Sequence, residues 1–127
     1  MPGTRKVPFK LVDRSTYRTS IKGAKVRTRA NVAEPVAVPL SELHATQERV
    51  NAERVAQHLD GQVYAPGARA PGHGGLVDFP IVVRVNGQLH LHDGHHRAAA
   101  AHARGDRTIQ ARVVDVDAIR SSDPAKP

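Results

Sequence analysis

Apolar and polar positions alternate most clearly in the second half of the chain. Residues 80–85 form a short apolar run, the pair Asn86-Gly87 follows, and residues 88–92 place leucines at alternate positions. An Asn-Gly pair between two such runs is a strong signal of a β-hairpin, because both residues accept positive φ angles. The pattern therefore predicts a hairpin whose second strand ends at about His92.

Two helices and a further strand are predicted on either side of this hairpin. Residues 97–104 contain four consecutive alanines and precede Gly105, a residue typical of the position just past a helix end. Residues 52–59 follow Asn51, whose side chain is a favourable N-cap, and carry apolar residues at helical spacing. The apolar segment at residues 109–116 predicts the last strand.

The remaining segments are shorter or richer in turn residues. Residues 36–40 predict an edge strand, since Pro39 cannot donate a ladder hydrogen bond. Residues 62–78 read as a long glycine- and proline-containing loop, and a short strand or hairpin is expected around residues 7–12 and 25–28. The order strand, helix, strand, strand, helix, strand predicts an α+β fold with a small mixed sheet flanked by helices.

The length of 127 residues fits one domain. We expect a basic N-terminal arm over residues 1–35, partly ordered at best, a folded domain over residues 36–118 and a polar tail over residues 119–127. Cysteine is absent, which excludes disulfides and a thiol nucleophile. No apolar run approaches the roughly 20 residues of a membrane span and no secretory signal is evident, so we expect a cytoplasmic protein that does not bind membranes.

The positive net charge of +7 is concentrated near the N-terminus. Nine basic residues, opposed only by Asp13, are candidates for binding nucleic acid through its phosphates: Arg5, Lys6, Lys10, Arg14, Arg18, Lys22, Lys25, Arg27 and Arg29. The alternative is a solvated basic segment that keeps the protein soluble. Only four aromatic residues are present, which argues against a platform of stacked bases.

The junction between the predicted hairpin and the alanine-rich helix concentrates polar groups. It reads His92-Asp93-Gly94-His95-His96-Arg97. The N–H groups of a helix start, the positive end of the helix dipole and a guanidinium would lie close together there, an arrangement that suits a phosphate. The junction is therefore the candidate site.

These segments resemble a known superfamily. The predicted hairpin, the Asp-Gly-His-His-Arg box, Ala100-Ala101, Gly105 and the strand over residues 109–114 look like the nucleotide-binding core of the ParB/sulfiredoxin fold, over residues 36–116. The superfamily includes nucleotide-dependent chromosome-partitioning clamps, sulfiredoxins, free-serine kinases and ParB-like nucleases. The sulfiredoxin reaction is excluded here, because that family needs a cysteine where this chain has His95 and His96.

The resemblance implies a bound nucleotide (ATP, ADP or CTP) with Mg²⁺. The residues implied for phosphate or nucleotide binding are Gly94, His95, His96, Arg97 and Gln47. Histidine can donate to phosphate or transfer a proton near neutral pH, and the candidates for catalysis are Asp93, His95, His96 and Glu48. Asp93 is also the candidate Mg²⁺ ligand, with a simple helix-capping carboxylate as the alternative.

His90 and His92 would share one face of a strand and could chelate a transition metal such as zinc. A resident transition metal is not expected, since a metal site usually recruits a ligand from elsewhere in the fold. Four functions stay open: a ParB-like nucleotide-binding protein, with slow NTPase activity, acting on or near DNA; a kinase of the free-serine type acting on a small molecule or nucleic acid; a metal-dependent nuclease; and a non-catalytic interaction module.

Overall fold

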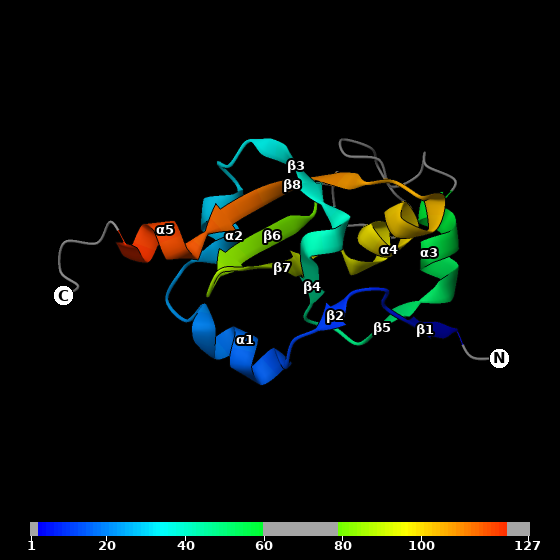
Figure 1. Cartoon of the computed structure of the whole chain (residues 1–127), viewed down its shortest axis with the longest axis horizontal. Helices are drawn as coiled ribbons and strands as arrows, with labels where there is room; N and C mark the ends of the chain where they lie inside the picture. The colour runs from blue at the N-terminus through cyan, green and yellow to red at the C-terminus, as the bar shows by residue number, and fades with distance from the viewer. Residues whose placement is uncertain (1–2, 60–78, 122–127) are drawn as a thin grey trace.

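The computed structural model describes residues 3–59 and 79–121 (Figure 1). The strands are β1 (Thr4–Lys6), β2 (Lys10–Leu11), β3 (Pro35–Pro39), β4 (Leu43–Ala45), β5 (Arg49–Asn51), β6 (Ile81–Val85), β7 (Gln88–Asp93) and β8 (Thr108–Asp115). The α-helices are α1 (Arg14–Ser20), α2 (Val26–Ala30), α3 (Ala52–Leu59), α4 (His95–Arg104) and α5 (Val116–Ser121), with one 3-10 turn, η1 (Leu40–Glu42).

A mixed sheet forms the centre of the molecule. Its strand order is β2-β4-β7-β6-β8-β3, in which β4 runs parallel to β7 and β6 parallel to β8, while β6 and β7 are antiparallel. Strands β1 and β5 form a separate antiparallel pair. Helices pack on the sheet, so the predicted α+β class with a small mixed sheet flanked by helices is confirmed.

The two faces of the sheet are covered by different parts of the chain. Helix α4 covers one face, where Leu89 and Leu91 of β7 pack against Ala98 and Ala101. On the other face, residues of α1, α2 and the start of α5 pack against Val83 and its neighbours on β6. The alanines of α4 suit this position, since small side chains allow a helix to approach a sheet closely.

The clearest sequence predictions are confirmed. Strands β6 and β7 form the hairpin, and Asn86 and Gly87 at its turn have φ angles of 54° and 74°, as a two-residue primed turn requires. The Oδ1 atom of Asn51 accepts from the N–H of Arg54 at 3.0 Å and so caps α3. Helix α4 ends at Gly105 as predicted, and it begins two residues earlier than the alanine pattern indicated.

The N-terminal segment differs from the expected arm. Strand β2 joins the sheet beside β4, and Tyr17, Val26 and Ala30 are buried in the same cluster as Val83. Residues 25–28, expected to be extended, lie at the start of α2. The segment is ordered over residues 4–35 because its few apolar side chains are buried against the core, although its helices are too short to form alone.

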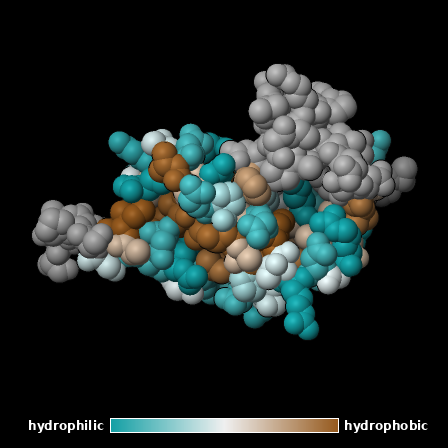
Figure 2. Space-filling view, turned by 90° about the horizontal axis from the view of Figure 1, so that it is seen from above, coloured by the Kyte–Doolittle hydropathy of each residue, from teal (hydrophilic) through white to brown (hydrophobic). Residues whose placement is uncertain are grey.

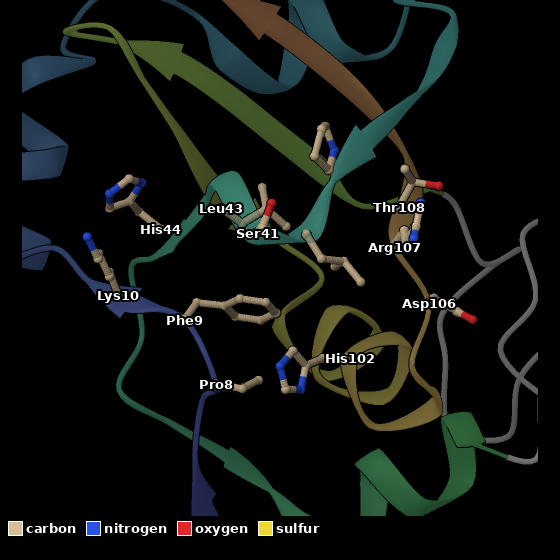
Figure 3. A pocket seen from close by; sticks show the side chains of 12 residues that line it. Pro8, Phe9, Lys10, Ser41, Leu43, His44, His102, Asp106, Arg107 and Thr108 are labelled. Carbon is tan, nitrogen blue, oxygen red and sulfur yellow. The ribbon is translucent and has the colours of Figure 1, made fainter.

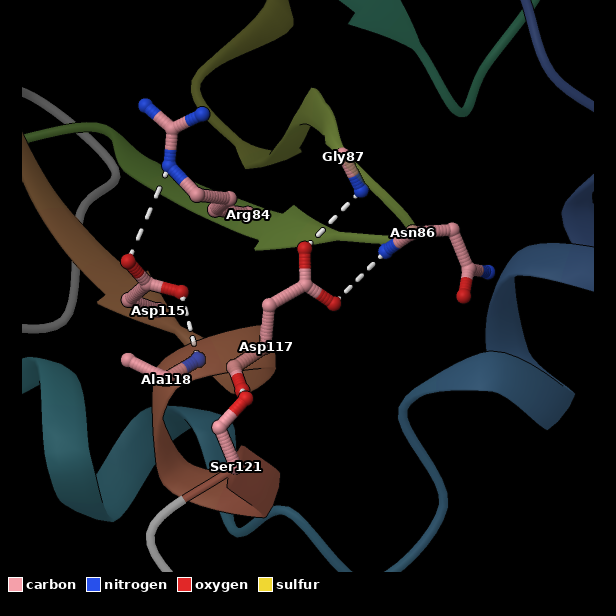
Figure 4. Close-up of polar contacts among 7 residues, drawn as sticks. All are labelled: Arg84, Asn86, Gly87, Asp115, Asp117, Ala118 and Ser121. Carbon is pink, nitrogen blue, oxygen red and sulfur yellow. Dashed lines mark hydrogen bonds and ion pairs between the residues drawn. The ribbon is translucent and has the colours of Figure 1, made fainter.

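A short helix, α5, occupies part of the predicted polar tail (Figure 4). The Oδ1 atom of Asp115 accepts from the N–H of Ala118 at 2.9 Å, which caps the helix. The carboxylate of Asp117 accepts from the N–H groups of Asn86 and Gly87, each at 2.8 Å. These bonds lower the pKa of Asp117 and tie α5 to the hairpin turn.

The edge of the sheet at β3 exposes apolar surface. Seen from above, the molecule shows brown apolar residues among hydrophilic ones (Figure 2). Val36 of β3 is 48% exposed, and Val32 in the preceding turn is 84% exposed.

Among the described residues no helix is both long and apolar enough to cross a membrane. The loop predicted over residues 62–78 lies outside the described residues.

Candidate functional site

The predicted junction lies where two parallel strands end side by side. Strand β4 ends at Ala45, strand β7 ends at Asp93, and α4 begins directly after Gly94. Ligands of sheet proteins commonly bind outside the carboxyl ends of parallel strands, next to a helix start. The fold therefore places the polar junction at a favourable position for binding.

Gly94 is required by two features of this junction. Its φ angle is +102°, which side-chain-bearing residues rarely adopt. A Cβ atom at this position would also lie 2.6 Å from the Cβ of Pro80. The close approach allows the chain to turn sharply from β7 into α4, with the Ala98 N–H bonded to the Gly94 carbonyl at 2.9 Å.

The two histidines after Gly94 hold the helix start in place. The Nε2 atom of His95 accepts from the N–H of Thr46 at 3.1 Å, and the Nε2 atom of His96 accepts from the N–H of Asn51 at 3.0 Å. Both rings therefore carry their proton on Nδ1 when neutral. The Nε2 atoms are therefore engaged with the backbone, and the Nδ1–H group is the donor that each neutral ring carries.

Burial keeps these histidines neutral. His95 is 5% exposed, and burial, with a smaller effect from His96, lowers its pKa to about 4. Burial, followed by the charge of Arg54, lowers the pKa of His96. At neutral pH the pair contributes hydrogen bonds rather than positive charge.

A pocket of about 300 Å³ opens beside the helix start. It brings together α1, α2, the ends of β4 and β7, and the first residue of α4. Its lining residues are Arg14, Tyr17, Arg18, Ile21, Arg27, Thr46, Gln47, His92 and His95. The three arginines are exposed, so the pocket is positively charged although its histidines are neutral.

Two contacts connect the pocket to β7. The guanidinium of Arg27 lies 3.6 Å from the carboxylate of Asp93, an exposed ion pair of small energetic value. The hydroxyl of Tyr17 and Nδ1 of His92 are hydrogen-bonded at 2.8 Å. Burial, and secondly the charge of Arg27, lowers the pKa of His92, while burial raises that of Tyr17.

The predicted site residues are divided between the pocket and its surroundings. Gln47 lines the pocket, and its side-chain amide donates to the carbonyl of Arg49 at 2.7 Å. Glu48, the expected general base, is exposed, and its backbone carbonyl accepts from the N–H of Val7 at 3.0 Å. Neither Glu48 nor Arg97 is among the described residues that line the pocket. Arg97 lies half-buried on α4.

In the part of the chain that the structure describes, the strand histidines His90 and His92 do not belong to a larger cluster of metal-binding side chains. No group of three or more metal-binding side chains is found there. His90 is 3% exposed and lies between the rings of His44 and Tyr17, with centroid distances of 5.6 and 5.2 Å. Its Nδ1 atom has no hydrogen-bond partner among the described residues, and burial lowers its pKa.

All nine basic residues of the N-terminal segment are exposed, as binding to nucleic acid would require. Three of them, Arg14, Arg18 and Arg27, also line the pocket, a position that their charge alone did not indicate. Sequence reasoning missed Tyr17 and Thr46 as pocket residues. The sequence signal that could have predicted α1 is Asp13, a residue type that favours the N-cap position. Its carboxylate accepts from the N–H of Thr16 at 2.9 Å and caps the helix.

No protein-family model and no curated protein matches this chain. Among solved structures, the chain is similar to the sulfiredoxin from Arabidopsis thaliana at 20% sequence identity. The similarity covers 68% of this chain and 93% of that one, with a TM-score of 0.45. It concerns the arrangement of the chain and does not extend to activity.

Proposed function

We propose that the protein binds the phosphate groups of a nucleotide in the pocket between α1, α2 and the start of α4. The observation that carries this proposal is the convergence of Arg14, Arg18 and Arg27 on a pocket at a helix N-terminus. Arginine presents several donors in a planar fork that matches phosphate oxygens. The start of α4, whose first residue His95 lines the pocket, adds the N–H groups and the positive dipole end of a helix N-terminus.

The ion pair between Arg27 and Asp93 supports an anionic ligand. The Asp93 carboxylate already places a negative charge next to Arg27, and phosphate oxygens can take the same kind of contact. The side chain of Asp93 is 48% exposed, so it can turn away when a phosphate arrives. A released Asp93 suits Mg²⁺, which prefers one or two carboxylates together with phosphate and water oxygens.

The two histidines at the start of α4 contribute geometry to this function. His95 and His96 hold the helix start against Thr46 and Asn51, which keeps the donors of the first turn in a fixed direction. Fixed donors bind an anion better than mobile ones, because less entropy is lost on binding. Binding is the function that we propose for the pocket, because its lining supplies three exposed arginines at a fixed helix start.

Calorimetric titration of the full chain with ATP, ADP, CTP and GTP, each with and without Mg²⁺, tests the proposal. The double variant Arg18→Gln with Arg27→Gln should weaken binding more than tenfold, because each charge-assisted bond that it removes is worth about 1.5 to 3 kcal/mol. Lys22→Gln is the matched control: it removes a positive charge from the same exposed segment but does not line the pocket.

Two further titrations test which group of the nucleotide is bound and where it binds. Tripolyphosphate binding as tightly as ATP would show that the pocket recognises phosphate without the nucleoside. Arg97→Ala tests the arginine of the predicted phosphate-binding turn, which is not among the described residues that line the pocket. Loss of binding in Arg97→Ala with full binding in the Arg18 and Arg27 double variant would overturn the proposed location.

A further inference from the structure

A second hollow lies at the opposite end of α4 from the phosphate pocket (Figure 3). It is a groove of about 690 Å³, formed by the chain before β2, by η1 and the start of β4, and by the residues around the start of β8. This volume lies within the range of about 300 to 1,000 Å³ that is common for sites of small organic ligands. The groove takes no part in the function proposed above.

The walls of the groove are held by backbone hydrogen bonds. The N–H of Leu40 donates to the carbonyl of Arg107 at 2.9 Å, which joins η1 to the chain before β8. Lys10 pairs with His44 in the parallel ladder between β2 and β4. The groove is therefore built by ordered segments and does not need to form when a ligand arrives.

The middle of the groove is apolar and aromatic. Leu40 and Leu43 are 4% and 3% exposed and form its buried wall. The rings of Phe9 and His102 meet edge to face, with centroids 5.9 Å apart, and Figure 3 shows both between the two ends of the groove. Such a lining favours a flat, apolar ligand body, because aromatic rings bind one another through stacked or edge-on contacts.

The ends of the groove carry positive charge. Figure 3 shows Lys10 at one end and Arg107 at the other. Asp106, the acidic residue of the lining, accepts from Arg104 at 3.0 Å, so its charge is already compensated. Within the described part of the chain, neither Lys10 nor Arg107 takes part in an ion pair.

We propose that this groove is a second binding site, which takes a small organic anion with a flat aromatic body. The body lies against Phe9, His102 and the leucine wall, and a carboxylate or phosphate of the ligand meets Lys10 or Arg107. The site is separate from the phosphate pocket, because the two share no lining residue.

The test uses 2-naphthoate as probe and 2-naphthylmethanol as its uncharged counterpart. Both are titrated into the ¹⁵N-labelled full chain, and amide shifts are followed by NMR. 2-Naphthoate should shift amides of the groove and bind about tenfold more tightly than the alcohol, since it gains a charge-assisted hydrogen bond. Equal binding of the two probes, or shifts confined to residues outside the groove, would overturn the proposal.

Variants show which side chains bind the probe. Lys10→Gln with Arg107→Gln should remove the preference for the anion, and Phe9→Leu should weaken both probes because it removes the aromatic ring while largely keeping the apolar volume. Lys22→Gln is the charge control and should change nothing. The double variant Arg18→Gln with Arg27→Gln separates the two proposals. It removes charge from the phosphate pocket but not from the groove, so it should leave naphthoate binding intact. Full naphthoate binding in the Lys10 and Arg107 double variant would contradict the second site.

Discussion

The histidines and the arginines around the start of α4 are both basic residues, yet their surroundings give them opposite properties. His95 is 5% exposed and neutral, and its Nε2 atom accepts a backbone hydrogen bond. The side chain of Arg27 is 69% exposed and stays charged. The buried groups fix the geometry of the site, and the exposed groups supply its charge.

This difference shows that different residues of one site can hold its geometry and attract an anion. A buried charged histidine would be costly because it loses its hydration, whereas a buried neutral ring can serve as a hydrogen-bond acceptor. An exposed arginine keeps its hydration until an anion replaces it. Substitutions of the two groups should therefore affect different measurements: histidine variants should change stability, and arginine variants should change binding.

The largest effect is expected at Gly94, on which the geometry of the helix start depends. Gly94→Ala should lower the free energy of unfolding by about 2 to 4 kcal/mol, since it combines an unfavourable positive φ with a steric clash. The clash is with Pro80, whose Cβ lies 2.6 Å from the position of the new methyl group. Urea unfolding followed by circular dichroism measures the loss.

Gly105→Ala is the matched control. Gly105 also has a positive φ, of +84°, but a Cβ there meets nothing within 4 Å. Its substitution should cost about 1 kcal/mol, the strain alone. Equal losses at the two glycines would show that Pro80 moves aside freely and that the helix start is not held as tightly as we infer.

The second effect is a loss of stability in acid that originates at His95. Its pKa falls from an ordinary 6.5 to about 4 in the folded protein, so between these values the unfolded chain binds a proton that the folded chain does not. Stability should therefore be complete above pH 6.5 and decrease as the pH falls toward 4, by about 3 kcal/mol in total. Urea unfolding at a series of pH values measures this slope.

His95→Gln tests the assignment. The side-chain carbonyl of glutamine can still accept from the N–H of Thr46, but it does not titrate in this range. The variant should lose the part of the acid dependence that belongs to His95 and keep its stability at pH 7 within about 2 kcal/mol of the original. An unchanged acid slope would transfer the effect to other groups, such as His92 and His96.

The sequence predicted best those elements whose pattern is long enough to be read locally. The β6–β7 hairpin, the caps at Asn51 and Gly105, and the helix after Gly94 all follow from turn residues and periodicity. The same reasoning located the polar junction, because a glycine between a strand and a helix is a local feature. The direction of the His95 and His96 rings could not be predicted from the sequence, because it depends on hydrogen bonds to Thr46 and Asn51, which lie far away along the chain.

The N-terminal segment shows the opposite case. Helix α1 spans Arg14–Ser20 and α2 spans Val26–Ala30, lengths that are unstable without tertiary contacts. Tyr17 and Val26 give no periodic signal, and only their burial in the core reveals that the segment is folded. The charges of Arg14, Arg18 and Arg27 were evident, but their convergence on one pocket follows from this packing.

A third effect is expected on DNA binding. It tests whether exposed lysines outside the pocket bind phosphate, as we propose for the arginines that line it. The combined variant Lys6→Gln, Lys22→Gln and Lys25→Gln changes exposed residues that do not line the pocket. If each lysine neutralises a DNA phosphate, the log–log salt slope should fall by about 0.9 for each phosphate that is no longer neutralised. A fluorescence anisotropy titration of a DNA duplex at several salt concentrations measures it.

Substitution is preferable to truncation here, because deleting the segment would remove Tyr17 and Val26 from the core. Nucleotide binding in the pocket should remain within twofold of the original in the triple variant. An unchanged salt slope would assign these lysines to solubility and would leave the pocket arginines as the phosphate-binding cations of the segment.

The smallest effect is expected at Tyr17, which joins the N-terminal segment to β7. Tyr17→Phe removes the hydroxyl that is hydrogen-bonded to Nδ1 of His92 at 2.8 Å and leaves the buried ring in place. The free energy of unfolding should fall by about 1 kcal/mol, the usual net value of one such bond. Thr19→Ala on the exposed side of α1 is the control and should change stability by less than about 0.5 kcal/mol. A Tyr17→Phe variant as stable as the original would show that water replaces the hydroxyl at His92, so that apolar packing alone holds α1 against the sheet.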